Sequence, residues 1–113
     1  MRLREIVDEL HLSVRTGDER LDQEVTGGYA GDLLSDVIAW SRMGQLWVTM
    51  QVNVNIVSVA VLKNLAGIVI VRGRQPDEDA VKKAVEAKIP IIISDMPAFE
   101  TVSKIYGLVW SRG

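Results

Sequence analysis

Cysteine does not occur among the 113 residues, and histidine occurs once, at His11. A chain without cysteine has no disulfides, thiolate metal ligands or cysteine nucleophiles. A single histidine cannot supply a zinc cluster built on several imidazoles. We therefore expect no metal, no other cofactor and no cysteine-based catalysis.

Clusters of basic residues and long apolar segments are also missing. The net charge is −2, and no Lys/Arg-rich block occurs, which argues against a nucleic-acid-binding surface. The apolar stretches are interrupted by Asn55, Lys63 and Asn64, so no transmembrane span is expected. The first residues alternate charged and apolar side chains, unlike a signal peptide. These features predict a cytoplasmic protein that binds neither nucleic acid nor membranes.

The composition is that of an aliphatic globular protein. Hydrophobic residues make up 48% of the chain and aromatic residues only 5%, so the core must consist mainly of Val, Ile, Leu and Ala. The length predicts a single domain over residues 1–113. A chain of this size buries roughly two thirds of its extended surface, enough for a substantial core.

Hydrophobic periodicity predicts a short amphipathic helix over 2–10, a strand over 11–15 and, from Gln45 onward, alternating strands and helices. Residues 45–62 allow two interpretations, because their β-branched content favours one long strand. A strand of that length would be exceptional, so we expect a break at Asn55. The expected elements are then a strand over 45–53, a helix over 55–65, a strand over 67–71, a helix from Pro76, a strand over 89–94 and a helix from Pro97 that ends at Gly107. The inward faces of the last two helices are expected to carry Ala80, Val81, Ala84 and Val85, and Phe99, Val102, Ile105 and Tyr106. This order predicts an α/β fold with helices on both faces of a mostly parallel sheet of about four or five strands, a three-layer α/β/α architecture.

The stretch from Glu24 to Asp36 carries three of the nine glycines. Thr26-Gly27-Gly28 is typical of a tight turn, and Asp32 is a favourable N-cap for a helix running to Arg42, with Gly44 beyond its end. Its apolar face would carry Leu33, Leu34, Val37 and Ile38. A glycine-rich loop before a helix can hold an anion, although a capped turn without a ligand is the simpler interpretation.

Three segments, residues 26–37, 44–51 and 55–62, together resemble the DRTGG domain family, and the likeness extends from about residue 14 to residue 106. The name-giving segment departs from the family, because Glu24-Val25 precede Thr26-Gly27-Gly28 where Asp-Arg is expected. The resemblance implies a fold like the N-terminal domain of HPr kinase/phosphorylase. It also implies a non-catalytic accessory or regulatory role, like that of the DRTGG domains that accompany phosphate acetyltransferases or lie between the CBS domains of pyrophosphatases. This chain would be such a module standing alone, with a partner enzyme or a small anionic ligand to bind.

In a parallel sheet, ligands bind outside the carboxyl ends of the strands. The residues expected to meet there are Thr26, Gly27, Gly28, Asp32, Asn53, Asn55, Arg72, Arg74 and Ser94. Two arginines beside helix N-termini suit a phosphate or carboxylate, as in a nucleotide-like ligand. The competing interpretation is that the polar residues are helix caps and that the arginines are solvated.

Two other functions remain open at this stage. Trp40, Trp47 and Trp110 are half of the six aromatic residues, and tryptophan favours interfaces, which predicts a homodimer acting as an adaptor without a ligand. Ordinary core packing would explain them equally well. An enzyme using Asp32 and Asp36 is disfavoured because no histidine base lies near them in the sequence.

Overall fold

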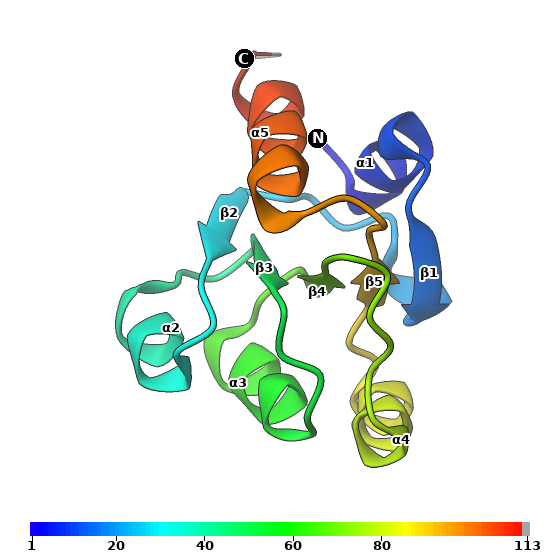
Figure 1. Ribbon diagram of the computed structural model, residues 1–113, viewed down its shortest axis with the longest axis vertical. Helices are drawn as coiled ribbons and strands as arrows, with labels where there is room; N and C mark the ends of the chain where they lie inside the picture. Colours follow the sequence, from blue (N-terminus) through cyan, green and yellow to red (C-terminus); the bar gives the residue numbers. More distant parts are fainter. Residues whose placement is uncertain (112–113) are drawn as a thin grey trace.

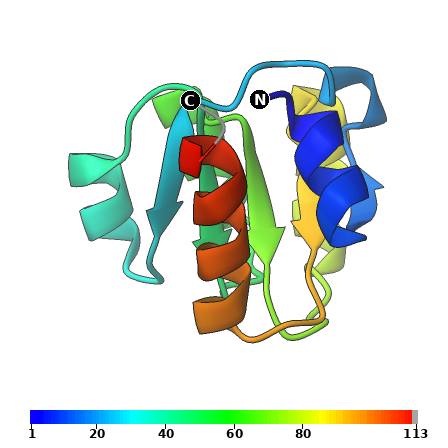
Figure 2. The ribbon, with the colours of Figure 1, turned by 90° about the horizontal axis from the view of Figure 1, so that it is seen from above.

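A computed structural model describes residues 1–111. Its elements are α1 (Leu3–Leu10), β1 (Ser13–Thr16), the 3-10 helix η1 (Asp18–Arg20), β2 (Gly27–Ala30), α2 (Leu34–Trp40), β3 (Gln45–Thr49), α3 (Asn55–Lys63), β4 (Gly67–Ile70), α4 (Glu78–Ala87), β5 (Ile91–Ile93) and α5 (Ala98–Ser111). The strands form one sheet in the order β1-β5-β4-β3-β2. Only β1 is antiparallel to its neighbour, and the other four strands point the same way (Figure 2).

Helices cover both faces of the sheet, which confirms the expected α/β architecture. α1 and α5 lie on one face, and α2, α3 and α4 lie on the other (Figure 1). Successive strand residues alternate between the two resulting cores. Leu46 and Val48 belong to the core under α1 and α5, whereas Trp47 is fully buried in the core under α2, α3 and α4. None of the helices formed by residues 1–111 is long and apolar enough to cross a membrane.

The expected break between strand and helix at Asn55 is confirmed. β3 ends at Thr49, earlier than expected, and α3 begins at Asn55. The side-chain oxygen of Asn53 accepts a hydrogen bond from the Asn55 N–H at 2.9 Å, which satisfies a donor that the first helical turn leaves free. Local side-chain chemistry therefore overrides the strand preference of the following Ile and Val residues.

The glycine-rich stretch differs from the expectation. Residues 27–30 form the strand β2, which pairs in parallel with β3, whereas a loop was expected. The glycines with positive φ are Gly17, Gly44 and Gly73, so Gly27 and Gly28 adopt ordinary extended backbone. Glycine adopts an extended backbone as readily as a turn. Pairing with β3 favours the extended backbone here.

The helix after β2 is also shorter than expected. α2 begins at Leu34, and Asp32 does not cap it, because the cap residue is Leu33 and no side chain bonds to its free N–H groups. α2 ends at Trp40, so Gly44 (φ 82°) turns the chain into β3 and does not end the helix. Of the expected apolar face, Val37 is fully buried and Leu34 is half-buried, but Leu33 and Ile38 are exposed.

The last helix faces the sheet differently from the expectation. Phe99 and Tyr106 are exposed, whereas Ile105 is buried as expected and Val102 is half-buried. The reason is Thr101, which is fully buried and accepts or donates a hydrogen bond at 2.8 Å with the Ser94 hydroxyl. The buried face of α5 therefore includes a polar residue that hydrophobicity alone would not select.

Two further expectations, about the end of α5 and the buried face of α4, were wrong. α5 continues through Gly107 to Ser111, because Val109 beyond it still packs against the core, so Gly107 is not a C-terminal cap. In α4, Ala80 and Ala84 are fully buried as expected and Val81 is half-buried, but Val85 is exposed. The two alanines define a narrow buried stripe, and Val85 lies outside it.

Candidate functional site

The carboxyl ends of β2, β3, β4 and β5 meet at one edge of the sheet (Figure 2). Of the residues expected there, the structure brings six to this edge: Asp32, Asn53, Asn55, Arg72, Arg74 and Ser94. Thr26 and Gly27 lie at the opposite edge, because they stand at the amino end of β2. There the Thr26 hydroxyl donates to the Met43 carbonyl at 3.0 Å. Gly28 lies within β2 itself, so the expected convergence of Thr26, Gly27 and Gly28 with this edge is wrong.

Asp32 ties the ends of two strands together. Its carboxylate oxygen accepts hydrogen bonds from the Thr49 hydroxyl and from the Met50 N–H, both at 2.8 Å. Its carbonyl accepts a third hydrogen bond from the Gln51 side-chain amide at 2.9 Å. The carboxylate is therefore already engaged in holding the backbone after β2 against the end of β3.

Asn53 and Asn55 serve the start of α3. The side-chain amide of Asn53 donates to the Gln51 side-chain oxygen at 3.0 Å, and the oxygen of Asn53 accepts from the Asn55 N–H. Both polar ends of Asn53 are used within the protein, whereas the Asn55 side chain is at the surface. The competing interpretation, in which Asn55 caps this helix, is wrong, because the cap residue is Val54 and Asn55 lies inside α3. The side chain that bonds to the helix start is that of Asn53.

Arg72 and Gly73 both adopt left-handed backbone, with φ of 60° and 66°. This geometry turns the chain sharply after β4 and leaves the Arg72 and Arg74 side chains exposed. The N–H groups of the turn donate to carbonyls of the protein, those of Met96, Ser94 and Val71. They do not form a backbone cradle, so any anion held here would have to be bound by the guanidinium groups.

The two guanidinium groups differ in what they contact. Arg74 donates to the Met50 carbonyl at the end of β3, close to Asp32 and Gln51, with which it lines a shallow depression. The Arg72 guanidinium group makes no hydrogen bond or ion pair with another residue of the described chain, 1–111. No ion pair within that part of the chain involves Arg74 either. Neither guanidinium group therefore has an ion-pair partner among residues 1–111, although the Asp32 carboxylate lies beside Arg74 and the Asp95 carboxylate lies beside Gly73.

Ser94 lies at the same edge but offers no surface. It is fully buried, and its hydroxyl bonds to the Thr101 hydroxyl and accepts the Met96 N–H at 3.2 Å. These bonds fix the start of α5 on the sheet. Ser94 is a structural residue of the turn between β5 and α5.

Asp36, the second carboxylate considered for catalysis, accepts a hydrogen bond from the Tyr29 hydroxyl. This bond raises the pKa of Tyr29, because it stabilises the protonated phenol, and partial desolvation adds to the same direction. Both carboxylates considered for catalysis are thus bonded to groups of the protein: Asp32 to the end of β3 and Asp36 to Tyr29.

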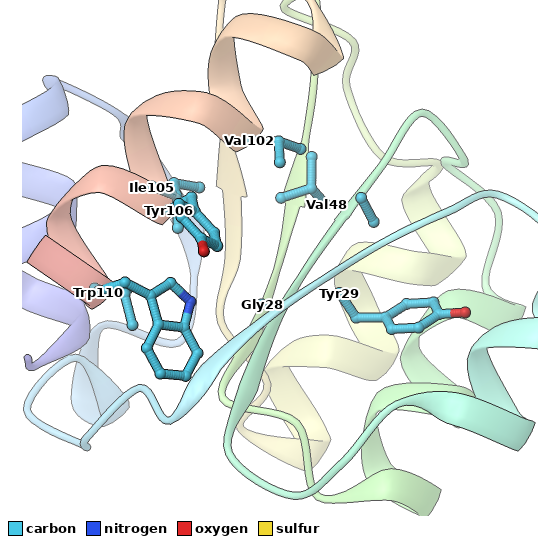
Figure 3. Close-up of a pocket in the computed structure, with 9 residues that line it drawn as sticks. Gly28, Tyr29, Val48, Val102, Ile105, Tyr106 and Trp110 are labelled. Carbon is cyan, nitrogen blue, oxygen red and sulfur yellow. The ribbon is translucent and has the colours of Figure 1, made fainter.

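A groove of about 400 Å³, which the sequence did not predict, lies between α5 and the sheet (Figure 3). Its floor is Gly28, Ala30 and Val48, and its wall carries Tyr106 and Trp110. The two rings lie 6.2 Å apart between centroids and are tilted by 45°. The groove exists because Gly28 has no side chain and Ala30 has only a methyl group beneath the helix. Two features of the sequence could have predicted this groove. Gly28 and Ala30 are small residues on the same face of β2, and Tyr106 and Trp110 are aromatic residues four positions apart on α5.

No protein-family model matches the sequence, and the search of curated proteins gave no match. Among solved structures, the fold is similar to the CBS and DRTGG domains of the regulatory region of Clostridium perfringens pyrophosphatase, complexed with the activator diadenosine tetraphosphate. The TM-score is 0.70 at 14% sequence identity, over 93% of this chain and 46% of that chain. The chain thus spans about half the length of that neighbour. The comparison establishes a likeness of fold, in agreement with the resemblance to the DRTGG domain.

Proposed function

We propose that this chain is a non-catalytic regulatory domain that binds a small anionic, nucleotide-like ligand through Arg72 and Arg74. The observation that carries the proposal is the pair of exposed guanidinium groups at the carboxyl edge of the parallel strands, neither of which forms an ion pair within residues 1–111. Ligands of α/β proteins favour this edge, and guanidinium groups match the geometry of phosphate oxygens.

The shape of the turn after β4 supports the proposal. Arg72 and Arg74 are separated only by Gly73, and both side chains start from a turn whose N–H groups are already bonded to the protein. The turn is therefore held in place before a ligand arrives, and little ordering of the backbone would oppose binding. Arg74 is further oriented by its bond to the Met50 carbonyl.

The similarity in fold supports a regulatory role. The solved neighbour is described as a regulatory region in complex with an activator nucleotide. Its ligand is polyanionic, and the charge on Arg72 and Arg74 suits a ligand of that class. The engagement of Asp32 and Asp36 by Thr49 and Tyr29 favours this role over an enzyme that would use the two carboxylates.

Thermal unfolding of the full chain tests the proposal, with diadenosine tetraphosphate, ATP and inorganic phosphate as probes. A ligand at about 100 times its Kd stabilises a protein by about 2.7 kcal/mol. For a domain of this size that corresponds to a rise in Tm of about 10 °C. We expect at least one probe to raise the Tm, and we expect the double variant Arg72→Ala/Arg74→Ala to lose most of that shift.

The control is a double variant that removes the same charge elsewhere. Arg15 lies on β1 and Lys82 on α4, both exposed and distant from the turn after β4. Arg15→Ala/Lys82→Ala should keep the full ligand-induced shift. Absence of a shift with every probe, or an undiminished shift in Arg72→Ala/Arg74→Ala, would contradict the proposal.

A further inference from the structure

β2 is the edge strand of the sheet, and α2 projects beyond this edge on the face opposite α5 (Figure 1 and Figure 2). β2 pairs with β3 on one side only, and the sheet ends there. The Gly31 N–H donates to the Val48 carbonyl at 3.1 Å. The backbone N–H and C=O groups of successive strand residues point to opposite sides of the strand. Those of Tyr29 therefore point toward β3, as in Gly31, whereas those of Gly28 and Ala30 point outward. No charged residue or proline occurs in β2 to discourage pairing with another strand.

The helix beside this edge carries an exposed aromatic face. Phe99, Tyr106 and Trp110 of α5 are 85%, 64% and 57% exposed. Tyr106 and Trp110 also wall the groove whose floor is β2 (Figure 3). An apolar surface of this extent next to unpaired backbone groups is typical of a protein interface.

We propose that a second copy of this chain covers the β2 edge, with the two β2 strands paired in antiparallel around a two-fold axis at Tyr29. In that register Gly28 of each copy lies opposite Ala30 of the other, and the outward N–H and C=O groups bond across the axis. The two sheets become one, and both α5 helices lie on the same face of it. The two grooves then join across the axis, where the aromatic residues of α5 fill them.

Three features favour a second copy over another kind of partner. The first is that a two-fold axis at Tyr29 pairs Gly28 of each copy with Ala30 of the other, so that the smallest side chains of β2 meet each other. The second is that the groove and the aromatic side chains that could fill it belong to the same surface. The third is that residues 27–31 carry no charge, so two copies meet without like-charge repulsion.

The available area also fits a dimer. An aromatic side chain can bury 150–250 Å², so the exposed fractions of Phe99, Tyr106 and Trp110 amount to roughly 400 Å² per copy. A stable interface buries about 800 Å² per partner. The three aromatics would supply about half of that area, and the β2 strand and groove floor lie directly beside them.

Sedimentation or light scattering of the full chain measures the outcome. The wild-type mass should be about 25 kDa, twice the 12.5 kDa of one chain. Tyr106→Glu should give the monomer, because a carboxylate would then be buried in the joined groove. Ala30→Pro should also give the monomer, since it removes an outward N–H that β3 does not use. Leu62→Glu, on α3 and 63% exposed, is the matched control and should remain dimeric.

A cross-link tests the register independently of mass. The chain has no cysteine, so Tyr29→Cys introduces a single thiol that faces its own copy across the two-fold axis. Opposed residues in such a non-hydrogen-bonded pair have Cα atoms about 4.5 Å apart, within the range of a disulfide. Oxidised Tyr29→Cys should run as a covalent dimer, whereas Val85→Cys, exposed on α4, should stay monomeric under the same conditions.

The mass and cross-linking results test the proposed dimer once circular dichroism shows that the variants are folded. A wild-type monomer at about 100 µM overturns the proposal, because an interface of standard size would be populated at that concentration. So does a dimer that survives both Tyr106→Glu and Ala30→Pro, or a Tyr29→Cys variant that cross-links no better than Val85→Cys. Dimerisation involves neither Arg72 nor Arg74, so it can fail while ligand binding succeeds.

Discussion

Asp32 joins the ends of β2 and β3, and its replacement by alanine should therefore weaken the fold. The substitution removes two hydrogen bonds to a carboxylate, from the Thr49 hydroxyl and the Met50 N–H. Hydrogen bonds to charged groups contribute about 1.5–3 kcal/mol each, but Asp32 is exposed to solvent, so we take the value of an ordinary hydrogen bond, about 1 kcal/mol, for each of the two. The Thr49 hydroxyl, on a side chain only 2% exposed, would keep only the Gln51 N–H as a partner. We expect a loss of about 2 kcal/mol in the free energy of unfolding.

Urea denaturation measures this loss. With an m value of about 1.5 kcal/mol per M, Asp32→Ala should lower the urea midpoint by about 1.3 M. Thr49→Val together with Asp32→Ala should cost less than the two separate losses added, because the two residues share one hydrogen bond. Glu86→Ala, an exposed acidic position on α4, should change the midpoint little and controls for the loss of one negative charge. An unchanged or raised midpoint in Asp32→Ala would refute the structural role and return Asp32 to the candidates for binding or catalysis.

Two further predictions follow from single residues. Gly107→Ala should stabilise the protein by about 0.5–1 kcal/mol in urea denaturation, because Gly107 lies inside α5 and an added Cβ would meet no atom within 4 Å; a loss of stability would indicate that α5 ends there. In a Tyr106→Phe background, absorbance titration should give Tyr29 a pKa above the ordinary 10.0, and Asp36→Asn should lower it. Since the folded-state pKa is raised, the stabilisation from this bond is complete below pH 10 and is lost as the pH rises through the folded-state pKa; an Asp36→Asn variant with an unchanged Tyr29 titration would contradict it.

The architecture could be predicted where hydrophobicity and length point the same way. The apolar run of β4 has no polar position, which is typical of a strand covered on both faces, and the structure buries it completely. The break at Asn55 was predictable because a longer strand would be exceptional and asparagine suits a helix start. Only its mechanism, the bond from Asn53 to the helix start, required coordinates.

The prediction failed where a polar residue or a pairing partner decides the local structure. Thr101 would be assigned to the surface by its hydropathy, yet it is fully buried and bonded to Ser94, whereas Phe99 is exposed. Trp47 was one of the three tryptophans considered for an interface. It is fully buried within the chain, and its indole N–H donates to the Gly31 carbonyl at 2.8 Å. Neither the Thr101–Ser94 bond nor the Trp47–Gly31 bond could be predicted from the spacing of apolar residues.

For the candidate site, some residues could be placed correctly from the sequence and others could not. Residues that follow a strand, such as Asp32, Arg72 and Arg74, could be assigned to the carboxyl edge as soon as the strands were known to be parallel. Thr26 and Gly27 could not be assigned correctly, because the glycine-rich stretch was expected to follow its strand. An error of a few residues in where a strand begins moves such residues to the opposite edge of the sheet.

The glycines of β2 acquire a different physical meaning once they belong to a strand. In a loop, Gly28 would be useful for its freedom of φ, and its N–H could point at an anion. In β2 its φ is ordinary, and an added Cβ would meet only the Leu46 carbonyl oxygen at 3.5 Å, an ordinary contact. Neither strain nor crowding within one chain therefore requires glycine at this position. What glycine does provide is an open floor to the groove under α5, which any larger side chain at position 28 would partly fill.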